Sequence, residues 1–160
     1  MNPTFRMAEQ RSSVDEMDDM GMTRLMHAAD EGKLKEVEDL LLRGADPNKP
    51  ADDFHEPYTP LMFASYQGHV EVVQRLIKGG ASVDKEEEGN GWTALLFAAK
   101  QGNRDVVSLL LNSNANPNWY VDDDCTALSL ASHNGHEEVV KELLAFGAKV
   151  MWSNECLVGA

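Results

Sequence analysis

Hydrophobic and polar positions recur along this chain in four copies of one frame. Each copy runs from a threonine to a leucine two residues on, an alanine three later and a glycine four later, followed by aliphatic residues at helical spacing. The threonine lies 9 residues before that glycine in every copy, and 21 before a second glycine or an asparagine. The copies open at Thr23, Thr59, Thr93 and Thr126, in steps of 36, 34 and 33 residues. Self-similarity at such a period predicts a repeat architecture.

Each copy predicts two short helices. In the third copy we expect one helix over Thr93–Gln101, capped by the threonine hydroxyl, and a second over residues 103–112. Asn114 then suits a left-handed residue after the second helix. The aliphatic side chains of that second helix form an i, i+4 stripe: Val106, Val107, Leu110 and Leu111. Helices of this length do not persist alone in water, so the pairs must stack on one another.

These residues resemble the ankyrin repeat family. The motifs that carry the resemblance are Thr59-Pro60-Leu61 with Ala64, Gly68-His69, Val72-Val73 with Leu76-Ile77, and Gly80-Ala81, with equivalents in all four copies. The resemblance implies an all-α ankyrin-repeat solenoid of stacked helix-turn-helix units with short β-hairpin fingers. We expect the repeat domain over residues 16–150, with repeats beginning near 18, 54, 88 and 121. Residues 1–15 are expected to be a disordered tail, and 151–160 a C-terminal tail or partial cap.

The frame departs from the family at one position. The family often has a histidine after the leucine of its Thr-Pro-Leu-His motif, whereas this chain has Met26, Met62, Leu96 and Ser129 there. The hydrogen bonds of such a histidine are therefore expected to be absent or replaced by packing.

The resemblance implies that partners are bound by finger tips and by the concave surface of the first helices. Carried over by position, the finger-tip candidates are Asp19, Met20, Met22, His55, Glu56, Tyr58, Asn90, Trp92, Asp122, Asp123 and Cys125. The candidates at the ends of the first helices are Asp30, Glu31, Tyr66, Gln67, Lys100, Gln101, His133 and Asn134. Among them, Tyr58, Tyr66 and Trp92 are large amphipathic rings of the kind enriched in binding hot spots.

Charge narrows the class of partner. The formal net charge is -13, which disfavours nucleic acid and favours a basic partner. The connecting segments contain 13 of the 27 acidic residues, against only two lysines: Asp15, Glu16, Asp18, Asp19, Asp52, Asp53, Glu56, Glu86, Glu87, Glu88, Asp122, Asp123 and Asp124, beside Lys49 and Lys85. The plainer alternative is that acidic turns only keep a solenoid soluble.

The connecting segments also differ in length. The segment from Asp46 to Tyr58 is three residues longer than the shortest one. Insertions on one face of a repeat array mark its binding side, although neutral drift in a tolerant loop is the alternative. Trp119 and Tyr120 are expected to cover the neighbouring finger rather than to face a ligand.

Catalytic, metal and cofactor sites are not indicated. His69 and His136 stand where the resemblance implies structural histidines, and Cys125 has no histidine at a nucleophile spacing. The acidic run 122–124 lacks the spacing of a calcium loop, and no glycine-rich phosphate cradle is present. No apolar run is long enough to span a membrane. Two distant cysteines and the lack of a signal-peptide pattern favour a cytoplasmic or nuclear location.

The leading hypothesis is a non-enzymatic module, without a cofactor, that binds a basic or mixed basic-apolar peptide or protein segment. One alternative is a scaffold or regulatory segment of a larger protein, such as a histone-tail or methyl-lysine reader or a ubiquitin-ligase substrate adaptor, with other domains of a longer chain as partners. Another is self-association through the last repeat, whose aliphatic side chains have little sequence after them. A cap formed by Met151, Trp152, Leu157 and Val158 is the competing expectation there.

Overall fold

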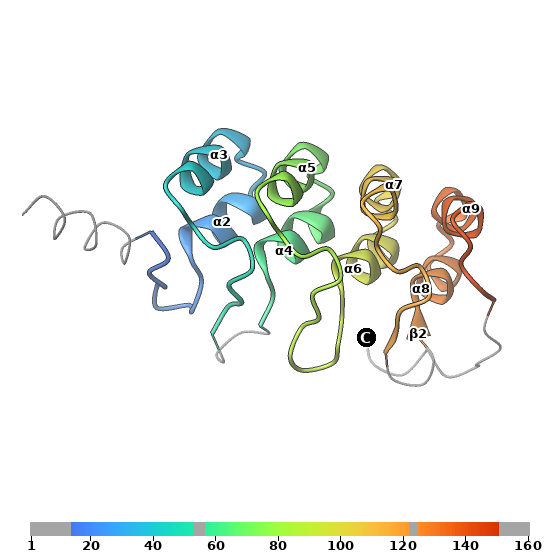
Figure 1. Cartoon of the computed structure of the whole chain (residues 1–160). Helices are drawn as coiled ribbons and strands as arrows, with labels where there is room; N and C mark the ends of the chain where they lie inside the picture. The colour runs from blue at the N-terminus through green and yellow to red at the C-terminus, as the bar shows by residue number, and fades with distance from the viewer. Residues whose placement is uncertain (1–13, 53–56, 122–124, 151–160) are drawn as a thin grey trace, which may run out of the picture.

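The computed structural model of this chain describes residues 14–52, 57–121 and 125–150. In this part of the chain, eight helices form four consecutive pairs (Figure 1). The first helices of the pairs lie in one row: α2 (Arg24–Asp30), α4 (Pro60–Gln67), α6 (Ala94–Gln101) and α8 (Ala127–His133). The second helices form the other row: α3 (Leu34–Leu42), α5 (Val70–Lys78), α7 (Arg104–Asn112) and α9 (Glu137–Ala145). The predicted all-α solenoid is confirmed.

The main apolar core runs through the stack because each pair buries its apolar side against its neighbours. The frame alanines of the first helices are at most 1% exposed, and their small size lets these helices approach closely: Ala28, Ala64, Ala98 and Ala131. The core also reaches into the segment predicted to be a disordered tail. Val14 is 3% exposed, and the Asp15 carboxylate accepts the backbone N–H of Asp46 at 3.1 Å. The folded unit therefore includes these two residues, unlike the predicted boundary.

Each first helix follows a threonine. In three of them, the side chain three residues later accepts the threonine N–H, a bond that was expected to be absent or replaced by packing. The sulfur of Met26 accepts the N–H of Thr23 at 3.3 Å, and the sulfur of Met62 accepts that of Thr59 at 3.3 Å. Ser129 supplies the equivalent acceptor in the last repeat. Thioethers and a hydroxyl therefore replace the histidine of the family motif through hydrogen bonds, rather than through packing alone.

Thr93 does not cap its own helix, so the prediction for this threonine is wrong. Its side chain makes no capping hydrogen bond, and its hydroxyl is buried without a hydrogen-bond partner. Leu96, three residues on, has no polar side-chain atom to accept the Thr93 N–H, so neither bond of a reciprocal cap forms here. The other expectations for this repeat are confirmed, since α6 and α7 match the predicted ranges within one residue and Asn114 has φ 68°.

A polar side chain at the start of α5, α7 and α9 joins each of these second helices to the preceding repeat. His69 Nε2 donates to the carbonyl of Asp30 at 2.9 Å, and His136 Nε2 donates to that of Lys100 at 3.0 Å. Asn103 does the same in the third repeat, donating to the carbonyls of Ser65 and Tyr66 at 2.9 and 2.8 Å. The structural role predicted for the two histidines is confirmed.

The connecting segments project together from the side of the first helices (Figure 1). In the last finger, β1 (Tyr120–Val121) pairs antiparallel with β2 (Cys125–Thr126). Side chains of one finger bond to the backbone of the next. The carboxylate of Asp15 accepts the N–H of Asp46 at 3.1 Å, and that of Asp84 accepts the N–H of Asn116 at 3.1 Å. These bonds hold the fingers in register beside the first-helix row.

Candidate functional site

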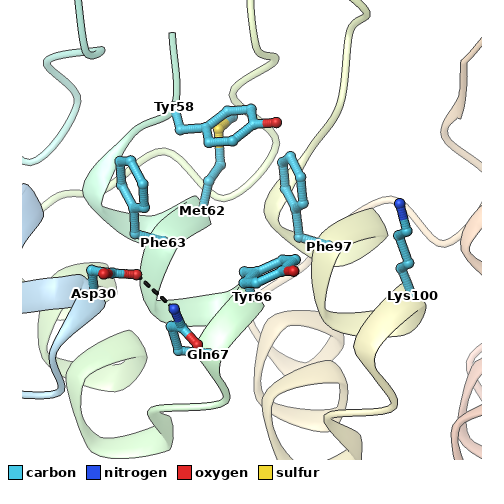
Figure 2. Close-up of a pocket in the computed structure, with 8 residues that line it drawn as sticks. All are labelled: Asp30, Tyr58, Met62, Phe63, Tyr66, Gln67, Phe97 and Lys100. Atoms are coloured by element: carbon cyan, nitrogen blue, oxygen red, sulfur yellow. Dashed lines mark hydrogen bonds between the residues drawn. The ribbon is translucent and has the colours of Figure 1, made fainter. Parts of the chain in front are cut away.

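A pocket of about 340 Å³ opens on the row of first helices, where the first three repeats lie side by side. Its lining comes mainly from α4, with contributions from α2, α6 and the second finger (Figure 2). The lining residues are Asp30, Tyr58, Met62, Phe63, Tyr66, Gln67, Phe97 and Lys100. Five of them were predicted from the sequence as contact residues: Asp30, Tyr58, Tyr66, Gln67 and Lys100. The structure brings these five together in one site.

Aromatic rings form the walls of the pocket. Phe97, only 7% exposed, lies at the centre of a cluster in which its ring centroid is 4.8 Å from that of Tyr58 and 6.3 Å from that of Tyr66. Trp92 packs on the same ring at 5.0 Å, and Tyr58 also contacts Phe63 at 5.7 Å. These separations lie in the range of favourable aromatic pairs. The rings of two fingers and two helices thus support one another, and the wall is held in place by packing.

Two opposite charges border the pocket. The Asp30 carboxylate accepts a hydrogen bond from Gln67 Nε2 at 2.8 Å, on the α2 side. On the opposite side in Figure 2, Lys100 extends from α6. Its ammonium lies 5.3 Å from the ring centroid of Trp92, within the reach of a cation–π contact. Because the lining contains one carboxylate and one ammonium, its formal charge is zero.

The pocket follows from the frame, because stacking places equivalent positions of adjacent repeats side by side. Asp30, Tyr66 and Lys100 each lie two residues after the frame alanine. Phe63 and Phe97 each lie two residues after the frame leucine. The sequence interpretation missed this second pair and Met62, since residues next to a buried leucine resemble core. Aromatic residues at one frame position in two adjacent copies were the signal that could have found the pocket.

Other predicted contact residues lie on the surface but outside the pocket. Met20 is 50% exposed on the first finger, beside the exposed Asp19, and Asn90 is exposed on the third finger. The helix-end candidates Glu31, Gln101, His133 and Asn134 are exposed as well. His55, Glu56, Asp122 and Asp123 lie outside the described residues.

Met22 and Cys125 are buried, so the prediction that they are exposed at finger tips is wrong. Met22 is 8% exposed and packs with Met26 and Ala51, and Cys125 is 7% exposed within the main core. Both immediately precede the threonine that opens a first helix, so their side chains pack against the stack. In the described structure neither offers a contact surface to a partner.

The acidic residues of the fingers divide into surface and structural groups. Glu16, Asp18, Asp19, Asp52, Glu86 and Glu88 are exposed. Glu87 is only 3% exposed, and its carboxylate accepts the backbone N–H groups of Gly89 and Asn90, the latter at 2.7 Å. Glu87 therefore holds the turn of the third finger and does not belong to the acidic surface.

Asp18 is exposed and also accepts structural hydrogen bonds. His27 Nε2 donates to its carboxylate at 2.6 Å, and the backbone N–H groups of Met22 and Met20 donate to the other oxygen. These bonds, that of His27 first, hold the pKa of Asp18 below its ordinary value because they favour the charged carboxylate.

The two aromatic residues predicted to cover a finger behave differently. Trp119 is partly buried, and its Nε1–H donates to the carbonyl of Gly91 at 3.0 Å, so it covers the third finger as predicted. Tyr120 is 61% exposed on β1. Leu144 is 46% exposed on α9, and the proposed capping residues after it lie outside the described residues. The cap and the self-association therefore stay predictions.

Among the described residues, no group of three or more His, Cys, Asp or Glu side chains is placed to hold a metal ion. None of the helices in the described ranges combines the length and the apolar character needed to cross a membrane.

Comparison with known proteins places the fold among repeat proteins. A family model described as "Ankyrin repeats (3 copies)" matches residues 25–118 and again 61–154. "Ankyrin repeat and KH domain-containing protein mask-1" of Caenorhabditis elegans is 30% identical over 122 residues, which are 76% of this chain and 4% of that protein. "Ankyrin repeat and SAM domain-containing protein 6" of Mus musculus is 36% identical over 92 residues, 58% of this chain and 7% of the relative.

A third relative is named as a phosphodiesterase. "Glycerophosphocholine phosphodiesterase gde1" of Schizosaccharomyces pombe is 42% identical over 79 residues, which are 49% of this chain and 7% of that protein. The chain thus spans at most 7% of the length of each of these three proteins.

Proposed function

Because this chain belongs to the ankyrin repeat family, whose repeats are protein–protein interaction modules, we propose that it is a non-enzymatic module that binds a basic or mixed basic-apolar segment of another protein. The segment lies along the first-helix row and meets the exposed finger tips. One observation carries the proposal. Five predicted contact residues from three repeats converge on one aromatic pocket, and acidic side chains are exposed on the fingers beside the same helix row.

The two features have separate physical roles. Exposed carboxylates on the fingers and a net charge of -13 attract a basic segment and speed its encounter with the surface. The rings supply the apolar area that holds it. Tyr66, 44% exposed at the pocket, is best placed as an anchor, whereas Tyr58 and Trp92 support the wall from partly buried positions.

A role as a scaffold or regulatory segment is the second candidate. It is favoured by the length of the relatives, since this chain corresponds to at most 7% of each. The two candidates are compatible if the module positions a partner for other domains. A cytoplasmic or nuclear location remains a prediction.

Selection of random peptides displayed on phage tests the proposal directly. We expect peptides selected on the wild-type chain to be enriched in lysine and arginine, and to bind more weakly as salt rises from about 50 to 300 mM. Tyr66→Ala should weaken their binding at least tenfold, while Leu42→Ala, which truncates an exposed apolar side chain on the second-helix row, should not. Selected peptides without basic residues, or an equal response to both variants, would reject the proposal.

A further inference from the structure

We infer that the pocket between α4 and α6 seats one uncharged apolar side chain of the bound segment, flanked by a basic residue near Asp30 and an acidic residue near Lys100. This inference rests on the proposed function and names the chemistry that its pocket recognises. The apolar anchor supplies affinity, and the two flanks set the orientation of the segment along the row.

The lining is suited to an apolar guest. Rings and the buried Met62 line the cavity, and the aromatic cluster is already packed before a ligand arrives. A volume of about 340 Å³ lies at the small end of ligand pockets, and it is large enough to admit one leucine or phenylalanine side chain. Burying a leucine or phenylalanine side chain in such a site is worth a factor of about 10 to 150 in affinity.

The same geometry disfavours a cation in the pocket, such as trimethyllysine. A cation cage needs an accessible aromatic face and uncompensated negative charge. Here the ammonium of Lys100 already lies over the ring of Trp92, and the Asp30 carboxylate is bonded to Gln67. An entering cation would meet Lys100 in a lining whose formal charge is zero.

Charge complementarity identifies the flanking residues. Asp30 belongs to α2 and Lys100 to α6, with the pocket between them (Figure 2). Both side chains are partly exposed, so an incoming charge reaches them. A segment with a basic residue on one side of its anchor and an acidic residue on the other therefore matches both ends of the pocket.

Synthetic peptide arrays separate these features. The central residue is fixed as leucine, phenylalanine, serine, lysine or trimethyllysine, and the flanking positions are randomised, with both lysine and glutamate allowed. We expect the leucine and phenylalanine arrays to retain the wild-type chain at least tenfold more strongly than the other three. Their best binders should have opposite charges on the two sides of the anchor. Tyr66→Ser should abolish the preference for an apolar centre, and Tyr120→Ser should preserve it.

Double-mutant cycles on the best peptide then assign the flanks. Asp30→Asn should couple to replacement of the basic flank by glutamine, and Lys100→Gln to replacement of the acidic flank, each by a factor of about 3 or more, while the crossed pairs show no coupling. Basic peptides that bind equally with serine or trimethyllysine at the centre would overturn this inference and leave the proposed function standing. If no peptide in any array binds, both are rejected.

Discussion

Ser129 and Thr126 hold the start of α8 through reciprocal hydrogen bonds. The Ser129 hydroxyl accepts the N–H of Thr126 at 2.9 Å, and the Thr126 hydroxyl accepts the N–H of Ser129 at 3.2 Å. The equivalent pair at α6 is Thr93 and Leu96, where the Thr93 hydroxyl is buried without a hydrogen-bond partner. The same frame position is thus a complete cap in one repeat and an incomplete one in another.

Replacing each threonine by valine should therefore change the free energy of unfolding differently. Thr126→Val removes a capping acceptor and should lower the free energy of unfolding by about 1 kcal/mol. Thr93→Val replaces an unpaired buried hydroxyl by a methyl group of similar shape, so its effect should be neutral or stabilising. Urea unfolding followed by circular dichroism measures both. Equal losses in the two variants would contradict this account of the caps.

The contrast between these threonines also shows how far the sequence can predict the structure. The frame predicted the helices and the left-handed Asn114, because those features depend on local spacing. The resemblance implied a structural role for His69 and His136, but not their bonds to the preceding repeat. It could not predict that the sulfurs of Met26 and Met62 accept backbone N–H groups at the caps, since a buried methionine normally contributes packing alone.

The candidate site was predictable only in part for a related reason. Tyr66 and Lys100 were found by position in the repeat, but the burial of Met22 beside Ala51 depends on how the first two fingers pack. Glu87 was counted with the surface acids because a run of glutamates usually faces solvent. Its burial depends on the turn that its own carboxylate holds, a contact that residue type does not reveal.

Gly102 should be intolerant of a side chain for a reason that Gly135 does not share. Both glycines have positive φ, 78° and 75°, so alanine costs about 1 kcal/mol of backbone strain at either position. A Cβ on Gly102 would lie 2.5 Å from the ring of His136, whereas one on Gly135 would meet nothing within 4 Å.

Gly102→Ala should therefore lower the free energy of unfolding by about 1 to 3 kcal/mol more than Gly135→Ala. Urea titrations of the two variants provide the comparison. Combining Gly102→Ala with His136→Ala should recover the overpacking part of the loss. If the two single variants are equally stable, the ring of His136 does not press on this glycine as the structure indicates.

Glu87 should contribute more to stability than its neighbour Glu88. Glu87→Ala leaves the backbone N–H groups of Gly89 and Asn90 without their acceptor, and hydrogen bonds to a charged group are worth about 1.5 to 3 kcal/mol. Glu88→Ala removes an exposed carboxylate of the same finger and should change the free energy of unfolding by less than about 0.5 kcal/mol. Hydrogen exchange of the Asn90 amide should accelerate in the first variant alone. Unchanged exchange in Glu87→Ala would refute the role assigned to this carboxylate.

Asp18 should make stability depend on pH at the acidic end. Its pKa is lowered in the folded state, chiefly by the bond from His27, so the unfolded state binds the proton more readily. The contribution of the carboxylate is fully present above the ordinary pKa of 3.8 and is lost as pH falls through the lower, folded value. The difference in free energy of unfolding between the wild type and Asp18→Asn should therefore shrink between about pH 5 and pH 2. An NMR titration of the Asp18 carboxyl carbon supplies the control, because His27→Ala should raise its pKa toward 3.8. A titration that is identical with and without His27 would show that this bond does not set the charge of the first finger.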